Sequence, residues 1–194
     1  MFTEIVRQLK IAILSLIFLS IITGVIYPLV MTGLAQLLFP NHANGSFIKQ
    51  NYEIKGSLLI AQPFNSDNYF WGRPSATTPF PDNAASSTGS NLATDNLALI
   101  TAVKARINLL KDDQKPIPVD LVTASGSGLD PEISPWAAFY QADRVAKARG
   151  LTQAQVINLI QQSIQSRQFV ILGEPRVNVL QLNLLLDQWT KNHG

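Results

Sequence analysis

A long apolar segment near the N-terminus restricts this chain more than any other feature of its sequence. Residues Ile11–Phe39 read IAILSLIFLSIITGVIYPLVMTGLAQLLF, and no charged residue occurs between Lys10 and Lys49. A bilayer core requires about 20 apolar helical residues, so this segment is long enough to cross one. The apolar part of a signal peptide is shorter, at roughly 7–15 residues. The sequence therefore predicts an uncleaved membrane anchor within residues 1–40.

Four residues within the anchor indicate how it packs. Pro28 removes one backbone hydrogen bond and tends to kink a helix, which membrane helices tolerate when neighbouring groups compensate. Ser20 and Gly24 lie four positions apart with Thr23 beside them, and small residues let a second helix approach closely. The sequence leaves open whether this stripe binds a partner helix or arises by chance. The alternative to an anchor is a core helix, which would have to be apolar on every face.

The basic residues that flank the anchor predict its orientation. Arg7 and Lys10 precede it, whereas only Lys49 follows it closely. Because the cytoplasmic flanks of membrane helices carry the excess of lysine and arginine, the N-terminus is expected in the cytoplasm. The rest of the chain, a linker over 41–55 and a domain over 56–194, is then extracytoplasmic.

Composition excludes several classes of site. The chain has no cysteine, which removes disulfides, thiolate nucleophiles and thiolate metal sites. Its two histidines are His42, beside the membrane segment, and His193, next to the C-terminus, so no histidine lies inside the domain to activate a serine. The carboxylates are scattered and form no recognisable acid–base pair: Asp82, Asp112, Asp113, Asp120 and Asp187. We therefore expect no catalytic residue, no metal site and no cofactor of the chain's own.

The domain alternates short apolar runs with helical patterns, which predicts an α+β fold on one membrane helix. Strands are expected at short apolar runs that are bounded by glycine or proline or that follow a turn. These runs are Lys55–Phe64, Asn68–Trp71, Val119–Ser125 and the buried pattern Phe169–Gly173. The polar stretch Pro79–Asn91 shows neither the helical nor the strand period of apolar residues, and it is expected to form a long loop.

Four helices are expected from apolar periodicity and from capping residues. The first begins near Thr94 or Asp95, and its apolar face comprises Leu97, Ile100, Val103, Ile107 and Leu110. The second begins at Ser134, which can cap it before Pro135, and ends at Gly150. Thr152 and Gln155 form a capping box for the third, and Asn178 caps a last helix that ends near Trp189.

The stretch ASGSGLDPEISPW, Ala124–Trp136, has glycines and hydroxyl residues that are typical of a phosphate-binding loop. A P-loop, however, needs G-x-x-x-x-G-K-[ST], and no lysine or arginine lies between Lys115 and Arg144. The third glycine of a dinucleotide fingerprint is also missing. A turn that leads into a helix is the favoured interpretation, and a nucleotide site at Ser125–Gly128 is the alternative.

The glycine turn at Gly150 joins two helices at the spacing of a helix-turn-helix motif. The second of these helices, within Gln153–Gln165, has no lysine or arginine, and the net charge of +2 includes no basic block. Phosphate contacts dominate DNA affinity, so a plain helical hairpin is favoured over a membrane-tethered DNA-binding protein.

Several longer stretches carry a family resemblance. They read GSLLIAQPF followed by YFWGRPSAT, then STGSNLATDN, VDLVTASGSGLDPEISPWAAFYQADRVAKARG and LGEPRVNVLQLNLLLD. They resemble the C subunits of the bacterial Kdp potassium-transporting P-type ATPase, over the anchor and nearly the whole domain.

The resemblance implies a noncatalytic subunit with one membrane helix and an extracytoplasmic domain in the bacterial cell membrane. In that family a potassium-channel-like subunit carries the ion, a P-type ATPase subunit hydrolyses ATP, and a very small subunit stabilises the assembly. ATP and potassium are thus handled by partner subunits. The C subunit is regarded as a catalytic chaperone that raises the ATP affinity of the ATPase subunit. Its proposed nucleotide contacts correspond here to Ser125, Gly126, Ser127 and Gly128.

The residues that match the family's motifs are Gln62, Arg73, Ser75, Asn91, Ser125, Asp130, Pro131, Arg176 and Asn183. Arg73 and Arg176 either pair with acidic residues within the chain or contact a partner. An extracytoplasmic domain would keep cytoplasmic ATP away from Ser125–Gly128, so any effect on ATP affinity is expected to be indirect.

The chain departs from the family pattern at four positions. Glu132 stands where the family often has histidine, so a site that relied on this histidine would be altered here. Trp136 and Gln181 replace a common alanine and glutamate, and Ala61 replaces the usual glycine.

Overall fold

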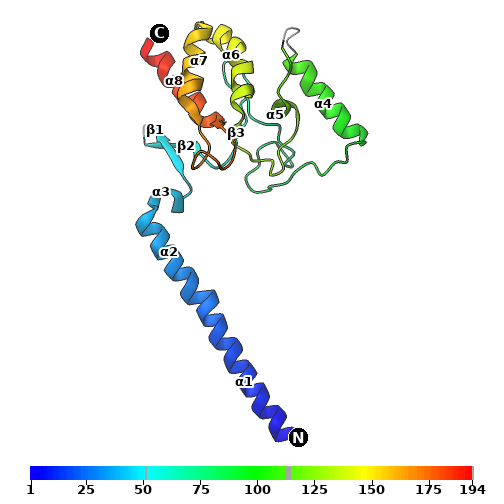
Figure 1. Cartoon of the computed structure of the whole chain (residues 1–194), viewed down its shortest axis with the longest axis vertical. Helices are drawn as coiled ribbons and strands as arrows, with labels where there is room; N and C mark the ends of the chain where they lie inside the picture. Colours follow the sequence, from blue (N-terminus) through cyan, green and yellow to red (C-terminus); the bar gives the residue numbers. More distant parts are fainter. Residues whose placement is uncertain (51, 112–114, 194) are drawn as a thin grey trace. The chain divides into compact units, whose positions relative to one another are not determined.

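The structure, a computed structural model, describes residues 1–50, 52–111 and 115–193. The chain divides into two compact units, Met1–Phe47 and Ile48–Gly194 (Figure 1). The first is helical and the second mixes helices with short strands, as the predicted α+β class requires. The predicted domain limits, with a linker over 41–55, stay a prediction.

The first unit is a nearly continuous helix. Its elements are α1 (Phe2–Ile21), the π-helical segment η1 (Ile22–Ile26), α2 (Tyr27–Leu38) and α3 (Pro40–Ala43). Residues Phe2–Leu38 form a candidate membrane span, with a mean hydropathy of 2.5 over an 18-residue window and no residue buried within the chain. A core helix would be covered by its own protein, so the exposed apolar surface favours a span over that alternative.

The π-helical segment ends two residues before Pro28, which occupies the first turn of α2. Proline has no backbone N–H, so the regular hydrogen-bond ladder is interrupted at this point. Thr23 within the segment donates its hydroxyl to the Leu19 carbonyl at 2.8 Å. A Cβ added at Gly24 would meet nothing within 4 Å, so this face of the helix is open.

The core of the second unit lies among α6 (Pro135–Arg149), α7 (Gln153–Ser163) and α8 (Val179–His193), which Figure 1 shows side by side. Their inward residues include Val145, Val156, Ile160, Leu182 and Leu186. The buried face of α6 is lined with alanine, which allows the neighbouring elements to approach closely.

A small antiparallel sheet completes the core. Its order is β3 (Glu132–Ile133), β5 (Arg176–Asn178) and β4 (Ile164–Gln165), with Val177 opposite both Ile133 and Ile164. Val177 is fully buried, so the central strand anchors the sheet on the helices.

The predicted caps of the core helices are confirmed. Ser134 accepts a hydrogen bond from the N–H of Ala137, and Gly150 ends α6 in the left-handed conformation. Thr152 and Gln155 form the capping box of α7, and Asn178 accepts from the N–H of Gln181 at the start of α8.

The remaining elements of the second unit are short or peripheral. They are the paired strands β1 (Phe47–Gln50) and β2 (Glu53–Ser57), α4 (Leu97–Leu110) and the single turn α5 (Val119–Val122). Figure 1 shows α5 between α4 and α6, and the carbonyl of Leu110 at the end of α4 accepts a hydrogen bond from the Tyr140 hydroxyl of α6. The predicted loop Pro79–Asn91 has no helix or strand.

Two strand predictions are wrong, and a third is only partly right. Val119–Ser125 begins as the turn α5, because Thr123 bonds back to the Val119 carbonyl through both its N–H and its hydroxyl. Only the first residues of Lys55–Phe64 are extended, in β2, and the apolar run after them is irregular. Phe169–Gly173 is an exposed hairpin tip and not a buried strand.

The segment Asn68–Trp71 is also not a strand, because side chains take the place of a neighbouring strand. Asn183 accepts from the Phe70 N–H at 2.8 Å and donates to the Phe70 carbonyl at 3.0 Å. Gln141 does the same for Trp71 at 2.8 and 3.1 Å. Two buried amide side chains thus satisfy the backbone that a sheet would otherwise pair.

The apolar face predicted for α4 is partly wrong. Val103 and Leu110 turn inward together with Leu99, whereas Leu97 is 78% exposed and Ile100 and Ile107 are also exposed. The helix begins one residue after its cap Asn96, which accepts from the N–H of Ala98.

Candidate functional site

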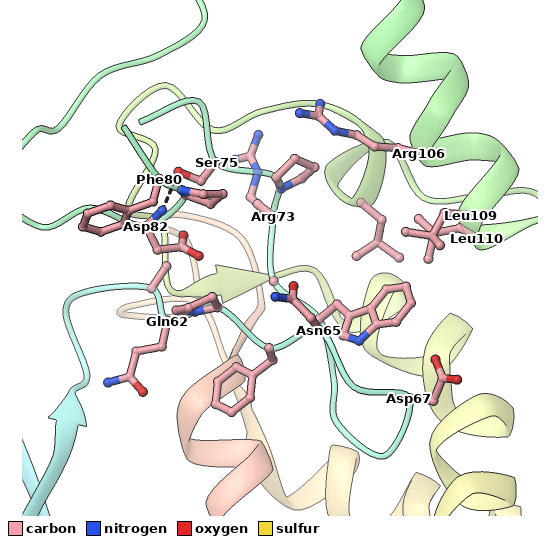
Figure 2. Close-up of a pocket in the computed structure, with 18 residues that line it drawn as sticks. Gln62, Asn65, Asp67, Arg73, Ser75, Phe80, Asp82, Arg106, Leu109 and Leu110 are labelled. Atoms are coloured by element: carbon pink, nitrogen blue, oxygen red, sulfur yellow. Dashed lines mark hydrogen bonds between the residues drawn. The ribbon is translucent and has the colours of Figure 1, made fainter. Parts of the chain in front are cut away.

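A cavity of about 610 Å³ opens in the second unit between the loops after β2 and the C-terminal end of α4 (Figure 2). Its apolar lining comes from Pro63, Phe64, Trp71, Pro74, Phe80, Pro81, Leu109, Leu110 and Leu121. Polar side chains enter it at a few positions, among them Asp82 and Arg106, which Figure 2 shows on different walls. A pocket of this kind, mostly apolar with a few polar groups, is the usual form of a binding site.

Burial changes the acid–base properties of both side chains. Desolvation raises the pKa of Asp82 above the ordinary aspartate range. Desolvation also lowers the pKa of the Arg106 guanidinium, which donates to the Val122 carbonyl at 3.0 Å. The cavity wall therefore carries a carboxyl group and a guanidinium in partly dry surroundings, and Asp67, Arg73 and Ser75 line it as well.

The loop Ser125–Leu129 uses its polar groups within the fold. The Ser125 hydroxyl is nearly fully buried and accepts from the Gly128 N–H at 2.8 Å. The Ser127 hydroxyl accepts from the Leu129 N–H at 3.1 Å, and the Ser125 N–H donates to the Pro74 carbonyl at 3.1 Å. Three donors that could hold a phosphate are thereby already engaged.

A second loop is packed against this one. The Ser127 carbonyl accepts from the Thr88 N–H at 2.9 Å and from the Ser87 hydroxyl at 3.0 Å. Ser75 donates its hydroxyl to the Gly128 carbonyl at 2.7 Å and accepts from the Asp82 N–H at 2.9 Å, the bond drawn in Figure 2. The loop after Ser125 is thus tied to the cavity wall through one serine.

The glycines of this loop are required by the close packing. Gly128 has φ of +68°, and a Cβ there would lie 2.5 Å from the Thr88 carbonyl oxygen. A Cβ on Gly89 would lie 2.8 Å from the Gly126 carbonyl oxygen. Gly126 itself faces open space. The glycine at position 128, part of the pattern that suggested a ligand-binding loop, instead allows the backbones of the two loops to pack closely together.

Both motif arginines pair within the chain. Arg73 lies 3.0 Å from the Asp130 carboxylate, and Arg176 lies 2.7 Å from Glu132. These four residues line a second, shallower cavity of about 310 Å³. Glu132 is thus the partner of Arg176, which lies in the central strand β5.

Comparison with known proteins identifies the family. The model of the family described as K+-transporting ATPase, c chain, matches residues 9–188. The chain belongs to this family. The Potassium-transporting ATPase KdpC subunit of Herpetosiphon aurantiacus is 58% identical over 91% of this chain and 94% of its own length. The proteins of the same name from Burkholderia cenocepacia and Methylococcus capsulatus are 58% and 53% identical, over 88% and 94% of this chain.

The other KdpC-motif residues serve the fold. Gln62 donates to the Lys55 carbonyl at 3.1 Å, and the Pro131 carbonyl accepts from the Val179 N–H at 3.0 Å. Asn183 holds Phe70, and the exposed Asn91 takes φ of +51°, which asparagine tolerates well. The structure therefore distributes these residues over several contacts and does not gather them in one pocket.

The predicted helical hairpin is present, and the basic residue next to its glycine turn is engaged within the chain. Arg149, at the end of α6, lies 2.7 Å from Asp187 and donates to the Asn68 carbonyl at 2.6 Å. The α7 surface carries no cation for phosphate contacts, as its sequence indicates.

The scattered carboxylates do not gather. Asp120 accepts from the Ser134 N–H at 2.7 Å, Asp187 pairs with Arg149, and Asp112 and Asp113 lie outside the described residues. Within the described ranges, no group of three or more histidine or acidic side chains could hold a metal ion.

Sequence reasoning missed the side chains that hold the loop before the cavity. Gln141 clamps Trp71, and Arg144 lies 3.9 Å above the Trp71 ring while donating to the Asp67 carbonyl. Burial lowers the pKa of Arg144 to about 10, an effect that nearby Asp67 opposes. A glutamine on the alanine-rich, inward face of α6 was the available signal.

Proposed function

We propose that this chain is a noncatalytic accessory subunit of the Kdp potassium transport assembly. The observation that supports this most is the family match, which covers both the membrane helix and the folded domain. The relatives are named as subunits of a potassium-transporting ATPase. Its expected partners are a potassium-channel-like subunit, a P-type ATPase subunit and a very small stabilising subunit. ATP and potassium are handled by the partners.

The chain acts by supporting the assembly and raises the ATP affinity of the ATPase subunit indirectly. The hydrogen bonds within Ser125–Leu129 support an indirect effect, because the donors that a phosphate would need already have partners. A direct nucleotide site at Ser125–Gly128 is the alternative. It is less favoured because the cation Arg73 already pairs with an acidic residue, Asp130.

Purification of the tagged chain from membranes in mild detergent tests the assembly role. We expect the channel-like and ATPase subunits to co-purify, and the half-saturating ATP concentration of the assembly to rise when the chain is omitted. A chain that purifies alone and leaves ATP dependence unchanged would overturn the proposal. Saturable ATP binding by the isolated full chain would instead favour direct contact.

We propose that the chain crosses the bacterial cell membrane once, with a cytoplasmic N-terminus and an extracytoplasmic domain. The flanking basic residues and the candidate span support this orientation. Because the chain has no cysteine, Ser90→Cys in the long exposed loop gives a single label site. A membrane-impermeant maleimide should label it in intact cells with an opened outer envelope. Labelling only after lysis would reverse the orientation.

A further inference from the structure

The hairpin between β4 and β5 exposes four consecutive apolar side chains. We name Phe169–Leu172 the apolar tip. Phe169, Val170, Ile171 and Leu172 are 84%, 83%, 77% and 55% exposed. Single exposed apolar side chains are common on protein surfaces, but a contiguous group of large ones marks a binding surface.

The apolar tip is held in one shape. Gln168 and Leu172 exchange both backbone hydrogen bonds at 2.9 Å, and Arg167 pairs with Glu174 at 2.6 Å across the base of the hairpin. Phe169 and Val170 have φ of +51° and +72°. A β-branched residue with positive φ is a strained exception, and such strain is concentrated at functional sites.

The charges around the apolar tip favour a protein partner over a lipid surface. Segments that insert into the bilayer interface carry an excess of lysine and arginine for anionic headgroups. Here the base of the hairpin has one arginine paired with one glutamate, and Glu174 is largely exposed. The rim is therefore neutral with both signs of charge. Such a rim around an apolar centre is the usual anatomy of a protein interface.

The fixed shape of the apolar tip also favours a protein partner over a lipid surface. A lipid surface needs no fixed side-chain arrangement, whereas a protein pocket gains affinity from a group that is ordered before binding. Interfaces concentrate their energy in a few central side chains that fill pockets, often aromatic ones. Phe169 and Ile171, the first and last residues of the turn between Gln168 and Leu172, meet that description.

We propose that the apolar tip is a docking element that inserts into an apolar recess on another subunit of the same transport assembly. This inference rests on the proposed function, because it requires partner subunits. It assigns the contact to one hairpin, with Phe169 and Ile171 as the central side chains and the Arg167–Glu174 pair at the rim.

Site-specific photocrosslinking in native membranes tests the contact. A benzophenone amino acid replaces Phe169 in the full chain, and the same amino acid at Leu97 serves as a matched exposed control. We expect irradiation to join the Phe169 variant to another assembly subunit, identified by mass spectrometry, and the Leu97 variant to give much less of this product. Lipid adducts alone, or products only within the chain, would overturn the proposal.

A double variant measures the contribution of the contact. Phe169→Ser with Ile171→Ser should reduce co-purification of the other subunits about ten-fold, the usual effect of removing central interface side chains. Leu97→Ser should leave it at the wild-type level. Thermal unfolding of each full chain in detergent shows whether folding is intact.

The failures of the two proposals are distinguishable. If the wild-type chain co-purifies with its partners and the double variant does so equally well, the docking proposal is wrong and the subunit role stands. If the wild-type chain does not co-purify, both are wrong.

Discussion

The loop Ser125–Leu129 and the hairpin Gln168–Leu172 are turns of equal length in the same unit, yet they relate to their surroundings in opposite ways. In the first, the Ser125 and Ser127 hydroxyls and the Gly128 carbonyl have hydrogen-bond partners in the chain. The second directs four apolar side chains outward and closes its backbone bonds on itself.

The two turns also differ in which residues adopt a positive φ, and this accounts for their opposite orientation. In the first loop the left-handed residue is Gly128, at a point where another backbone leaves no room for a Cβ. In the hairpin the left-handed residues are Phe169 and Val170, whose side chains require open space. In these two turns, glycine with positive φ marks close packing within the chain, whereas bulky residues with positive φ mark a surface that is available to a partner.

Gly128→Ala should have the largest effect on stability. The new Cβ would lie 2.5 Å from the Thr88 carbonyl oxygen, in a backbone conformation that costs a non-glycine residue about 1–2 kcal/mol. With overpacking added, we expect a loss of about 3 kcal/mol in denaturant unfolding of the full chain in detergent. Gly126→Ala, which faces open space, is the matched control and should change stability little. Equal effects would mean that the loop is not packed as described.

Ser125→Ala should have the next largest effect. It removes the buried acceptor of the Gly128 N–H and should cost about 1–2 kcal/mol, the usual penalty for an unsatisfied buried donor. Ser127→Ala, in the exposed part of the same loop, is expected to cost clearly less. ATP binding that is lost with Ser125→Ala in a folded chain would instead support direct nucleotide contact.

Asp82 on the cavity wall should give a smaller, pH-dependent effect. Because its pKa is raised in the folded state, the neutral form is favoured by folding, and its contribution to stability grows as the pH falls through that pKa. Asp82→Asn should therefore gain stability relative to the wild type near pH 7, and this gain should shrink near pH 4. Melting temperatures of both chains at the two pH values measure it. A gain that grows on acidification would contradict the raised pKa.

Phe169→Ser should have the smallest effect on stability, within about 0.5 kcal/mol, because an exposed side chain loses little when it is truncated. The same change is expected to affect partner binding strongly. A large loss of stability in the isolated chain would show that the apolar tip packs within its own unit. The contrast with Ser125 would then disappear.

The features that could be predicted from the sequence are those decided by neighbouring residues. Ser134, Thr152 and Gly150 cap or end helices through bonds that reach no more than a few positions along the chain. The membrane helix follows from length and composition alone. Both kinds of prediction rest on local information. The structure confirms the caps and shows an apolar helix that is long enough to span a membrane.

The errors arose where distant residues decide the conformation. FVIL reads as a buried strand because apolar residues in a short run usually lie inside, but no element of the described chain covers them. Phe70 and Trp71 have the composition of a strand, but amide side chains on two helices satisfy their backbone. The candidate nucleotide residues could be located by motif, whereas their hydrogen-bond partners, such as Pro74 and Thr88, could not.

The hydrogen bonds between the Asn183 amide and the Phe70 backbone have a consequence for folding during synthesis. Asn183 lies 113 positions after Phe70, within the last helix. During synthesis, which proceeds from the N-terminus, the Phe70 backbone must wait for nearly the whole chain before it finds its partner. Until then its polar groups can be satisfied only by water. A ribosome that stalls before Asn183 therefore leaves the domain with an open edge, so truncated products should be substrates for proteases.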